Sequence, residues 1–247
     1  MPINYSRRLT GTARRKDSNR DLGYVLAFVA GAINAAGFLA VHQYTSHMTG
    51  IVSSIADHLV LRSYGPVLTG LFALLAFVGG AACCALMVNG ARRRALHSQF
   101  AMPLLLEAIL LLGFGLLGAR LGSDGASVTL TVMLLSFMMG LQNATITKIS
   151  NTEIRTTHIT GVVTDIGIEL GKLAYWNGAS NAPPVRANID RLKMLALLAL
   201  LFFIGGVTGA LGFKHAGYVA TLPLALVLIA LAIAPVLDDL AAWRRPS

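Results

Sequence analysis

The chain carries one short motif twice, as SHMTG at residues 46–50 and as THITG at residues 157–161. Each copy follows an apolar stretch that contains the pattern Gly-x-x-Asn-Ala, at residues 31–35 and at residues 140–144. Patterns that recur in the same order indicate an internal duplication. Duplicated membrane proteins commonly hold a site between their two halves.

The composition predicts a membrane protein. Hydrophobic residues make up 55% of the 247 and charged residues only 13%, with a mean hydropathy of +0.67. A typical soluble domain has about 25% charged residues. Six apolar runs approach or exceed the roughly 20 residues that a helix needs to cross a bilayer. They are Leu22–Val41, Pro66–Val88, Ala101–Ala119, Val128–Ile149, Leu192–Phe213 and Tyr218–Leu237.

The net charge of +9 is distributed as in a membrane protein rather than in a nucleic-acid binder. Basic residues cluster before the first run, after the second, between the fourth and fifth, and after the last. With six crossings these segments share one side, and the other side keeps only Arg62, Arg120 and Lys214. This bias predicts that both termini are cytoplasmic. The expected partner is the bilayer with its anionic headgroups, and no nucleic acid is expected.

The two halves are expected to have opposite orientations. A third pattern supports the duplication, because FVGG at residues 77–80 aligns with FIGG at residues 203–206. Each half has three crossings, an odd number, so the sequence predicts an all-α protein of six transmembrane helices in a 3+3 inverted repeat. The predicted units are a basic N-terminal tail (1–21), two three-helix repeats (22–121 and 122–237) and a C-terminal tail (238–247).

Each motif begins a stretch too short and polar to span, so each half is expected to hold a short re-entrant or broken helix. Ser46 and Thr157 are suitable N-cap residues for these helices. Free amides at a helix N-terminus favour an anion, and a histidine beside them can carry a proton. The candidate substrate-binding residues are His47, Thr49, Gly50, His158, Thr160 and Gly161. The alternative is that both motifs only cap helices at the membrane surface.

Polar residues inside the predicted spans add further candidates. Asn34 and Asn143 either join helices by amide hydrogen bonds or contact a substrate. Glu107, about two turns into the third span, is a candidate proton carrier or ion ligand. The alternative for Glu107 is a protonated, hydrogen-bonded side chain, or one that reaches the headgroups.

The helix after the second motif carries two acids that share a face, Asp165 and Glu169. Lys172 is close enough along the helix to pair with Glu169. Asp165 aligns with Ser54, whereas the acid of the first copy, Asp57, stands elsewhere, so the halves differ in chemistry. Asp165 is therefore the preferred site residue, and Glu169 is interpreted as part of a solvated or salt-bridged face.

The sequence resembles the YoaK family of bacterial multi-pass membrane proteins of unknown function. The resemblance rests on SHMTG, on GLQNA at residues 140–144 and on TTHITG at residues 156–161, followed by Thr-Asp and Gly-x-Glu-Leu-Gly. It implies a location in the bacterial inner membrane. Asn34 stands where the family commonly has Asp, and Ile51 where it commonly has Asn. These departures weaken a cation or proton role for the first half and favour the second half as the site.

The function expected from these features is a transporter or channel for a small polar or anionic solute. In the working hypothesis the two re-entrant segments meet near the midplane and one half rocks against the other. The main alternative is an intramembrane enzyme with a cluster of His47, His158, Asp57 and Asp165; a structural or sensory protein is the other. Because no metal-ligand spacing is present, we expect no metal, cofactor or enzymatic activity. The sequence leaves a homo-oligomer open.

Overall fold

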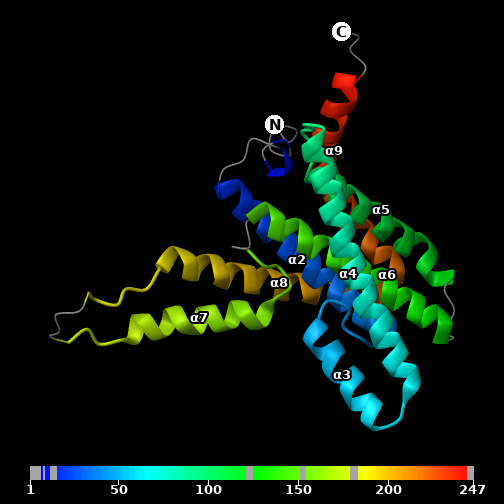
Figure 1. Cartoon of the computed structure of the whole chain (residues 1–247), viewed down its shortest axis with the longest axis horizontal. Helices are drawn as coiled ribbons and strands as arrows, with labels where there is room; N and C mark the ends of the chain where they lie inside the picture. The colour runs from blue at the N-terminus through cyan, green and yellow to red at the C-terminus, as the bar shows by residue number, and fades with distance from the viewer. Residues whose placement is uncertain are drawn as a thin grey trace.

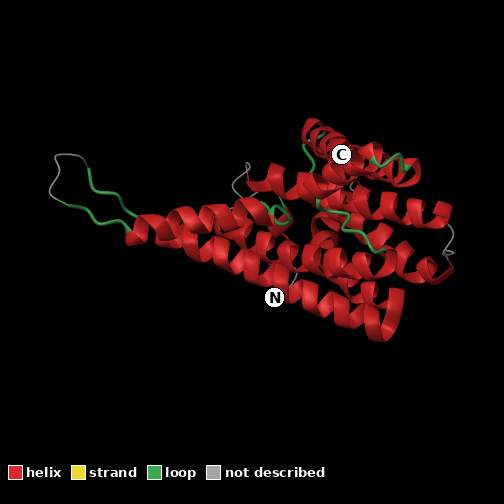
Figure 2. Ribbon diagram, turned by 90° about the horizontal axis from the view of Figure 1, so that it is seen from below, coloured by secondary structure: helices red, strands yellow, loops and turns green. Residues whose placement is uncertain are grey.

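The computed structural model of the chain describes residues 7, 9–11, 16–120, 125–150, 154–178 and 183–243. Within these ranges every regular element is a helix and no strand occurs (Figure 1; Figure 2). The long helices are α2 (Lys16–Val41), α4 (Tyr64–Arg93), α5 (Ala101–Leu117), α6 (Gly125–Ser150), α8 (Ile189–Ala216) and α9 (Leu222–Trp243). The shorter elements are α3 (Met48–Val60), α7 (Ile159–Ala174) and the 3-10 helices η1 (Gly118–Arg120) and η2 (Gly217–Thr221).

The six predicted apolar runs all fall within these long helices and the adjoining 3-10 turns. By length and hydropathy the described residues contain 5 candidate spans, and the last of them, Ile189–Trp243, covers 55 residues. That segment includes α8, η2 and α9. Gly217, with φ 60°, ends α8, a backbone conformation that glycine adopts without steric cost. The five-residue 3-10 helix η2 therefore separates α8 from α9 within this segment.

The long helices pack in pairs that join the two halves of the chain. Helix α2 packs against α8, α4 packs against α6, and α5 packs against α9 (Figure 1). The short helices repeat this symmetry, because α3 packs on α4 and α7 packs on α8. Exchanging the first half (α2 to α5) with the second (α6 to α9) thus turns each of these contacts into another observed contact.

Reciprocal glycine contacts bring α2 and α8 together. A Cβ at Gly31 would overlap the carbonyl oxygen of Phe202, and a Cβ at Gly205 would overlap the carbonyl oxygen of Phe28. The backbones therefore approach each other more closely than larger residues allow. Small residues serve this purpose at helix interfaces in membranes.

The same contact recurs between α4 and α6. A Cβ at Gly80 would overlap the carbonyl oxygen of Phe137, and one at Gly140 would overlap the carbonyl oxygen of Phe77. In both helix pairs the glycine and the phenylalanine of each helix are three residues apart. The duplication therefore extends to the detail of backbone packing.

These contacts correct the alignment of the third sequence pattern by one residue. The FVGG and FIGG match pairs Gly80 with Gly206, but the residue that contacts a phenylalanine carbonyl as Gly80 does is Gly205. Likewise Phe77 corresponds to Phe202 and not to its neighbour Phe203. The error arises because α8 has two consecutive phenylalanines before its two consecutive glycines, so either register gives a plausible match.

The N-terminal segment lies against the end of α9. Both Arg7 Nε and Arg7 Nη2 donate to the Asp238 carboxylate, at 2.7 and 2.6 Å, and Thr10 Oγ1 donates to the carbonyl of Leu231 at 2.8 Å. Arg7 and Thr10 thus lie beside the C-terminal half of α9. The predicted boundary between the halves, at residues 121 and 122, and the ends of both tails lie outside the described residues.

Candidate functional site

Each motif is held to the preceding long helix by one hydrogen bond between side chains. Ser46 Oγ donates to Asn34 Oδ1 at 2.8 Å, and Thr157 Oγ1 donates to Asn143 Oδ1 at 2.6 Å. The amide of Asn143 also donates to the carbonyl of Met139 at 2.7 Å. Asn34 and Asn143 therefore fix the positions of the two motifs relative to α2 and α6. Neither asparagine lines a cavity described below.

The prediction that Ser46 and Thr157 are N-cap residues is wrong by one position. The N-cap residues are His47 and His158, and neither makes a side-chain capping hydrogen bond. The serine and threonine hydroxyls are occupied by the asparagines, so they do not cap the helices. The first helical hydrogen bonds run from Ile51 N to His47 O at 3.0 Å and from Val162 N to His158 O at 3.1 Å.

The glycine of each motif makes room for the motif's own histidine. A Cβ at Gly50 would overlap the ring of His47, and a Cβ at Gly161 would overlap the ring of His158. Each imidazole therefore folds back over the first turn of its short helix. The sequence predicts that these glycines bind substrate, whereas the space beside each glycine is taken by an imidazole.

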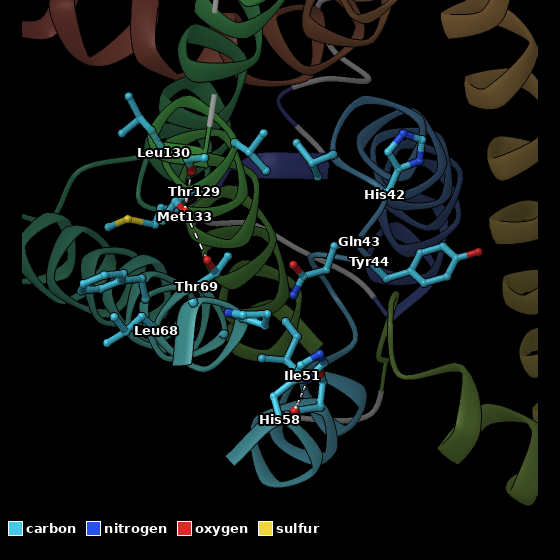
Figure 3. A pocket seen from close by; sticks show the side chains of 18 of the residues that line it. His42, Gln43, Tyr44, Ile51, His58, Leu68, Thr69, Thr129, Leu130 and Met133 are labelled. Atoms are coloured by element: carbon cyan, nitrogen blue, oxygen red, sulfur yellow. Dashed lines mark hydrogen bonds between the residues drawn. The ribbon is translucent and has the colours of Figure 1, made fainter. Parts of the chain in front are cut away.

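A cavity of about 1090 Å³, here called the α3 pocket, surrounds the first motif. Its wall comes from the end of α2, the following loop, α3, and the starts of α4 and α6, so both halves of the chain contribute (Figure 3). Three histidines line it, His42, His47 and His58. Of the described residues that line it, none carries a Lys, Arg, Asp or Glu side chain.

Hydroxyl and imidazole groups interrupt the apolar wall of the α3 pocket. Thr69 and Thr129 share a hydrogen bond of 3.2 Å across the gap between α4 and α6 (Figure 3). His58 Nδ1 lies 2.8 Å from the carbonyl oxygen of Ser54 and 3.2 Å from its hydroxyl. The pocket thus offers hydroxyl and imidazole groups for hydrogen bonding in mainly apolar surroundings.

A second cavity, of about 790 Å³ and here called the α7 pocket, surrounds the second motif. Four pairs of equivalent residues line the two pockets, one member of each pair in each pocket. They are His47 and His158, Gly50 and Gly161, Ile51 and Val162, and Ser54 and Asp165. Arg20 of α2 belongs to the α7 pocket, so this wall too combines both halves.

The α7 pocket is lined by arginine and aspartate side chains, which the α3 pocket lacks among its described residues. Three arginines from separate segments line it, Arg20, Arg155 and Arg191, together with Asp165 and Asp190. Arg191 Nη2 lies 3.0 Å from Asp165 Oδ2, so the preferred site acid is already paired. Arginine is well suited to bind carboxylate and phosphate groups through two parallel hydrogen bonds.

A salt bridge with a buried glutamate lies one turn beyond Asp165 on α7. Glu169 is 2% exposed, and its carboxylate accepts from Lys172 Nζ at 2.8 Å and from the backbone N–H of Asn188 at 2.7 Å. The Lys172 hydrogen bond, helped by the Asn188 N–H, holds the pKa of Glu169 below its usual range. Of the two alternatives for Glu169, the salt-bridged one is therefore correct and the solvated one is wrong.

The two motifs do not meet. The α3 pocket includes Phe38 and Val41 at the end of α2, and the α7 pocket includes Arg20 near its start, and no lining residue is shared. Along α2 these positions are about 30 Å apart, from a rise of about 1.5 Å per residue. The hypothesis of a joint site at the midplane is therefore corrected to two separate pockets.

The other predicted site residues are dispersed. Thr160 lines the α7 pocket, whereas Thr49 is exposed beside the α3 pocket without lining it. Glu107 is buried within α5, away from both pockets. His47 and His158 belong to different pockets, so the cluster considered for an enzyme is not assembled. The described residues contain no group of three His, Cys, Asp or Glu side chains that could hold a metal.

Sequence reasoning missed the arginines of the α7 pocket and two histidines of the α3 pocket. Arg20, Arg155 and Arg191 were interpreted only as orienting charges, because nothing in the sequence places α2 beside α8. His42 and His58 flank the first motif within twelve positions. Their proximity to the motif was a usable signal.

Long apolar helices, paired across two halves and enclosing two motif-bearing pockets, define a multi-pass helical membrane protein. The chain belongs to the family described as protein of unknown function (DUF1275), which matches residues 22–234. It is similar to the UPF0700 transmembrane protein YoaK of Bacillus subtilis (strain 168), with 24% identity over 207 residues, covering 82% of this chain and 88% of that protein. No solved structure gives a significant match. The resemblance to the YoaK family is therefore confirmed.

Proposed function

We propose that the protein moves a small polar or anionic solute across the bacterial inner membrane, with both termini in the cytoplasm. The observation that carries this proposal is the pair of corresponding pockets. Each pocket is lined by the same order of repeated motif positions and by residues from both halves. Motifs that served only as helix caps would not require a cavity beside each of them. Transporters built from repeats place their binding residues at the interface between halves.

The proposed architecture is a 3+3 inverted repeat with α3 and α7 as equivalent short helices. Exchange of the halves preserves the helix pairs and the glycine contacts, which supports a two-fold relation. Three long helices in each half require the second half to enter from the opposite face. The pockets then lie at opposite ends of α2, about 30 Å apart, which matches the hydrocarbon thickness of a bilayer.

In this arrangement the motifs act in turn rather than together. A solute that enters one pocket lies beside His47 or His158 and must pass between the helix pairs to reach the other. Rocking of the α3–α4 hairpin and the α7–α8 hairpin against the remaining helices would open one pocket while closing the other. The Arg191–Asp165 ion pair joins α8 to α7, so it would move with its hairpin.

The α7 pocket supports an anionic solute. The first helical bond of α7 is donated by Val162, so the amides of residues 159–161 have no helical acceptor. Arg20 and Arg155 add positive charge from two other segments of the wall. Free amides, a helix N-terminus and arginine together favour carboxylate or phosphate groups.

A thermal-shift screen of purified protein against carboxylates, phosphate, sulfate and neutral polar metabolites tests this proposal. A ligand at a hundred times its dissociation constant stabilises the folded state by about 2.7 kcal/mol. We expect an anion whose effect is lost in His158→Ala and Arg155→Gln. The matched control is His215→Ala, because His215 is exposed and lines neither pocket.

Flux of the same anion into proteoliposomes completes the test. Uptake that depends on wild-type protein and is lost in Arg155→Gln supports transport. Binding without any flux would contradict transport and favour a sensory protein. An anion that stabilises all three variants equally would place its site elsewhere.

A further inference from the structure

Glu107 is buried without any partner. Its side chain is 0% exposed, and neither carboxyl oxygen has a hydrogen-bond partner among the described residues. It lies on α5, which packs against α4, α6 and α9. Its neighbours on the same face of α5 are apolar and fully buried, namely Leu104, Ala108 and Leu111.

The second buried glutamate shows what a retained charge requires. Glu169 is almost as buried, but Lys172 and a backbone N–H balance its carboxylate. An ionised carboxylate without such partners costs several kcal/mol in an apolar interior. In the packed arrangement, Glu107 is therefore expected to carry a proton.

Among the residues that the structure describes, no charged group is paired with Glu107. On α4 the titratable neighbour is the Cys84 thiol, which lies within electrostatic range of Glu107 and of Lys148 on α6. On α9, Asp238 is held by Arg7, and Asp239 accepts from the backbone amides of residues 97 and 98. Tyr218 of η2 packs its ring on Phe114.

The surroundings fit a proton better than a metal cation. A hard cation such as Ca²⁺ needs six or more oxygen ligands, whereas Glu107 is surrounded mainly by aliphatic side chains. The described residues near it include no second carboxylate, and no three-ligand cluster is found. A proton needs only one carboxyl oxygen.

Helix α6, which packs against α5, also carries buried polar side chains that have no hydrogen-bond partner among the described residues. Ser136 and Gln142 are both 0% exposed, and their side-chain oxygen and nitrogen atoms also have no partner. Each unpaired buried group costs about 1–3 kcal/mol. If water enters beside α6 in another state of the protein, it can hydrogen-bond to these groups and remove this cost.

We propose that Glu107 is the proton-coupling site of the transport cycle, a role that rests on the proposed function. In the packed state it holds one proton as a carboxylic acid. When the rocking α3–α4 hairpin moves away from α5 and admits water, the O–H bond of Glu107 breaks, the proton passes to water, and the carboxylate remains. No electrons are transferred, and reprotonation from the other side restores the acid.

The test is infrared difference spectroscopy of purified protein between acidic and alkaline buffer, with the proton itself as the ligand. Wild type is expected to show a carboxylic acid C=O band that disappears at high pH and is absent from Glu107→Gln. Well above its midpoint the band should fall about tenfold for each pH unit. Glu169→Gln is the matched control and should keep the band.

Two results would overturn the proposal. A Glu107 band that persists at every pH identifies a permanently neutral structural group, and no Glu107 band at any pH identifies a permanent carboxylate. If Glu107→Gln fails to fold, Glu107→Asp replaces it, and the titrating band should shift rather than disappear. The measurement needs no solute, so it is independent of the flux assay. If Glu107 titrates but no flux is found, the transport proposal is contradicted and the protonation site is not. If flux is found but Glu107 does not titrate, only the proton coupling is contradicted.

Discussion

The Thr157 hydroxyl donates a hydrogen bond to the side-chain oxygen of Asn143 over 2.6 Å. The same bond occurs in the other half, from Ser46 to Asn34 over 2.8 Å. In each case a residue at the entry to a short helix is tied to the long helix before it. The pair of bonds therefore sets where His47 and His158 stand, and it explains why an amide lies within each of these apolar helices.

Removing one of these bonds should loosen its motif. Thr157→Val keeps the side-chain shape but leaves the Asn143 oxygen without its donor. Because an unsatisfied, partly buried acceptor costs about 1–3 kcal/mol, we expect a lower Tm in detergent. Thr164→Val is the control, since the exposed Thr164 hydroxyl bonds only within α7. Equal Tm values for the two variants would show that the Asn143 bond holds nothing in place.

The glycine contacts should tolerate no side chain. Gly140→Ala places a methyl group against the carbonyl oxygen of Phe77, and backbone cannot move aside as a side chain can. Overpacking of this kind typically costs about 1–3 kcal/mol. Gly171→Ala in α7 meets nothing within 4 Å and should be neutral or stabilising by up to about 1 kcal/mol. Thermal unfolding of both variants distinguishes a packing role for Gly140 from a flexible one.

The Glu169 salt bridge should make stability depend on pH on the acid side. The pKa of Glu169 is lowered in the folded state, so its contribution is complete above the ordinary value of 4.5 and is lost as the pH falls through the folded value. We therefore expect the Tm difference between wild type and Glu169→Gln to be largest near neutral pH and to shrink in acid. A difference that grows in acid would contradict the assigned direction.

Much of the fold follows from the sequence because a bilayer imposes a simple length and hydropathy requirement. The six apolar runs meet this requirement, and the long helices with their adjoining 3-10 turns contain all six. Their ends were less predictable, since α2 begins six residues before Leu22 and α9 continues six residues beyond Leu237. Outside the hydrocarbon region hydropathy no longer sets where a helix stops.

The candidate site was predictable only in part. Repetition identified His47 and His158, because a duplicated motif is visible in one chain. It did not give their separation, which depends on the length and direction of α2. Arg20 and Arg191 line one pocket only because α2 packs against α8. The register of that helix pair depends on Gly205, which the sequence alone does not distinguish from Gly206.

The sidedness of the two motifs tests the central claim most directly. Thr49→Cys and Thr160→Cys, each in a background with Cys83→Ala and Cys84→Ala, would be labelled in oriented vesicles with a membrane-impermeant thiol reagent. Both threonines are exposed in the structure, so neither position needs unfolding to react. The inverted repeat predicts that Thr49→Cys reacts from the outside and Thr160→Cys only from the cytoplasmic side. Reaction of both from the same side would contradict two pockets on opposite faces, and with them the proposed transport path.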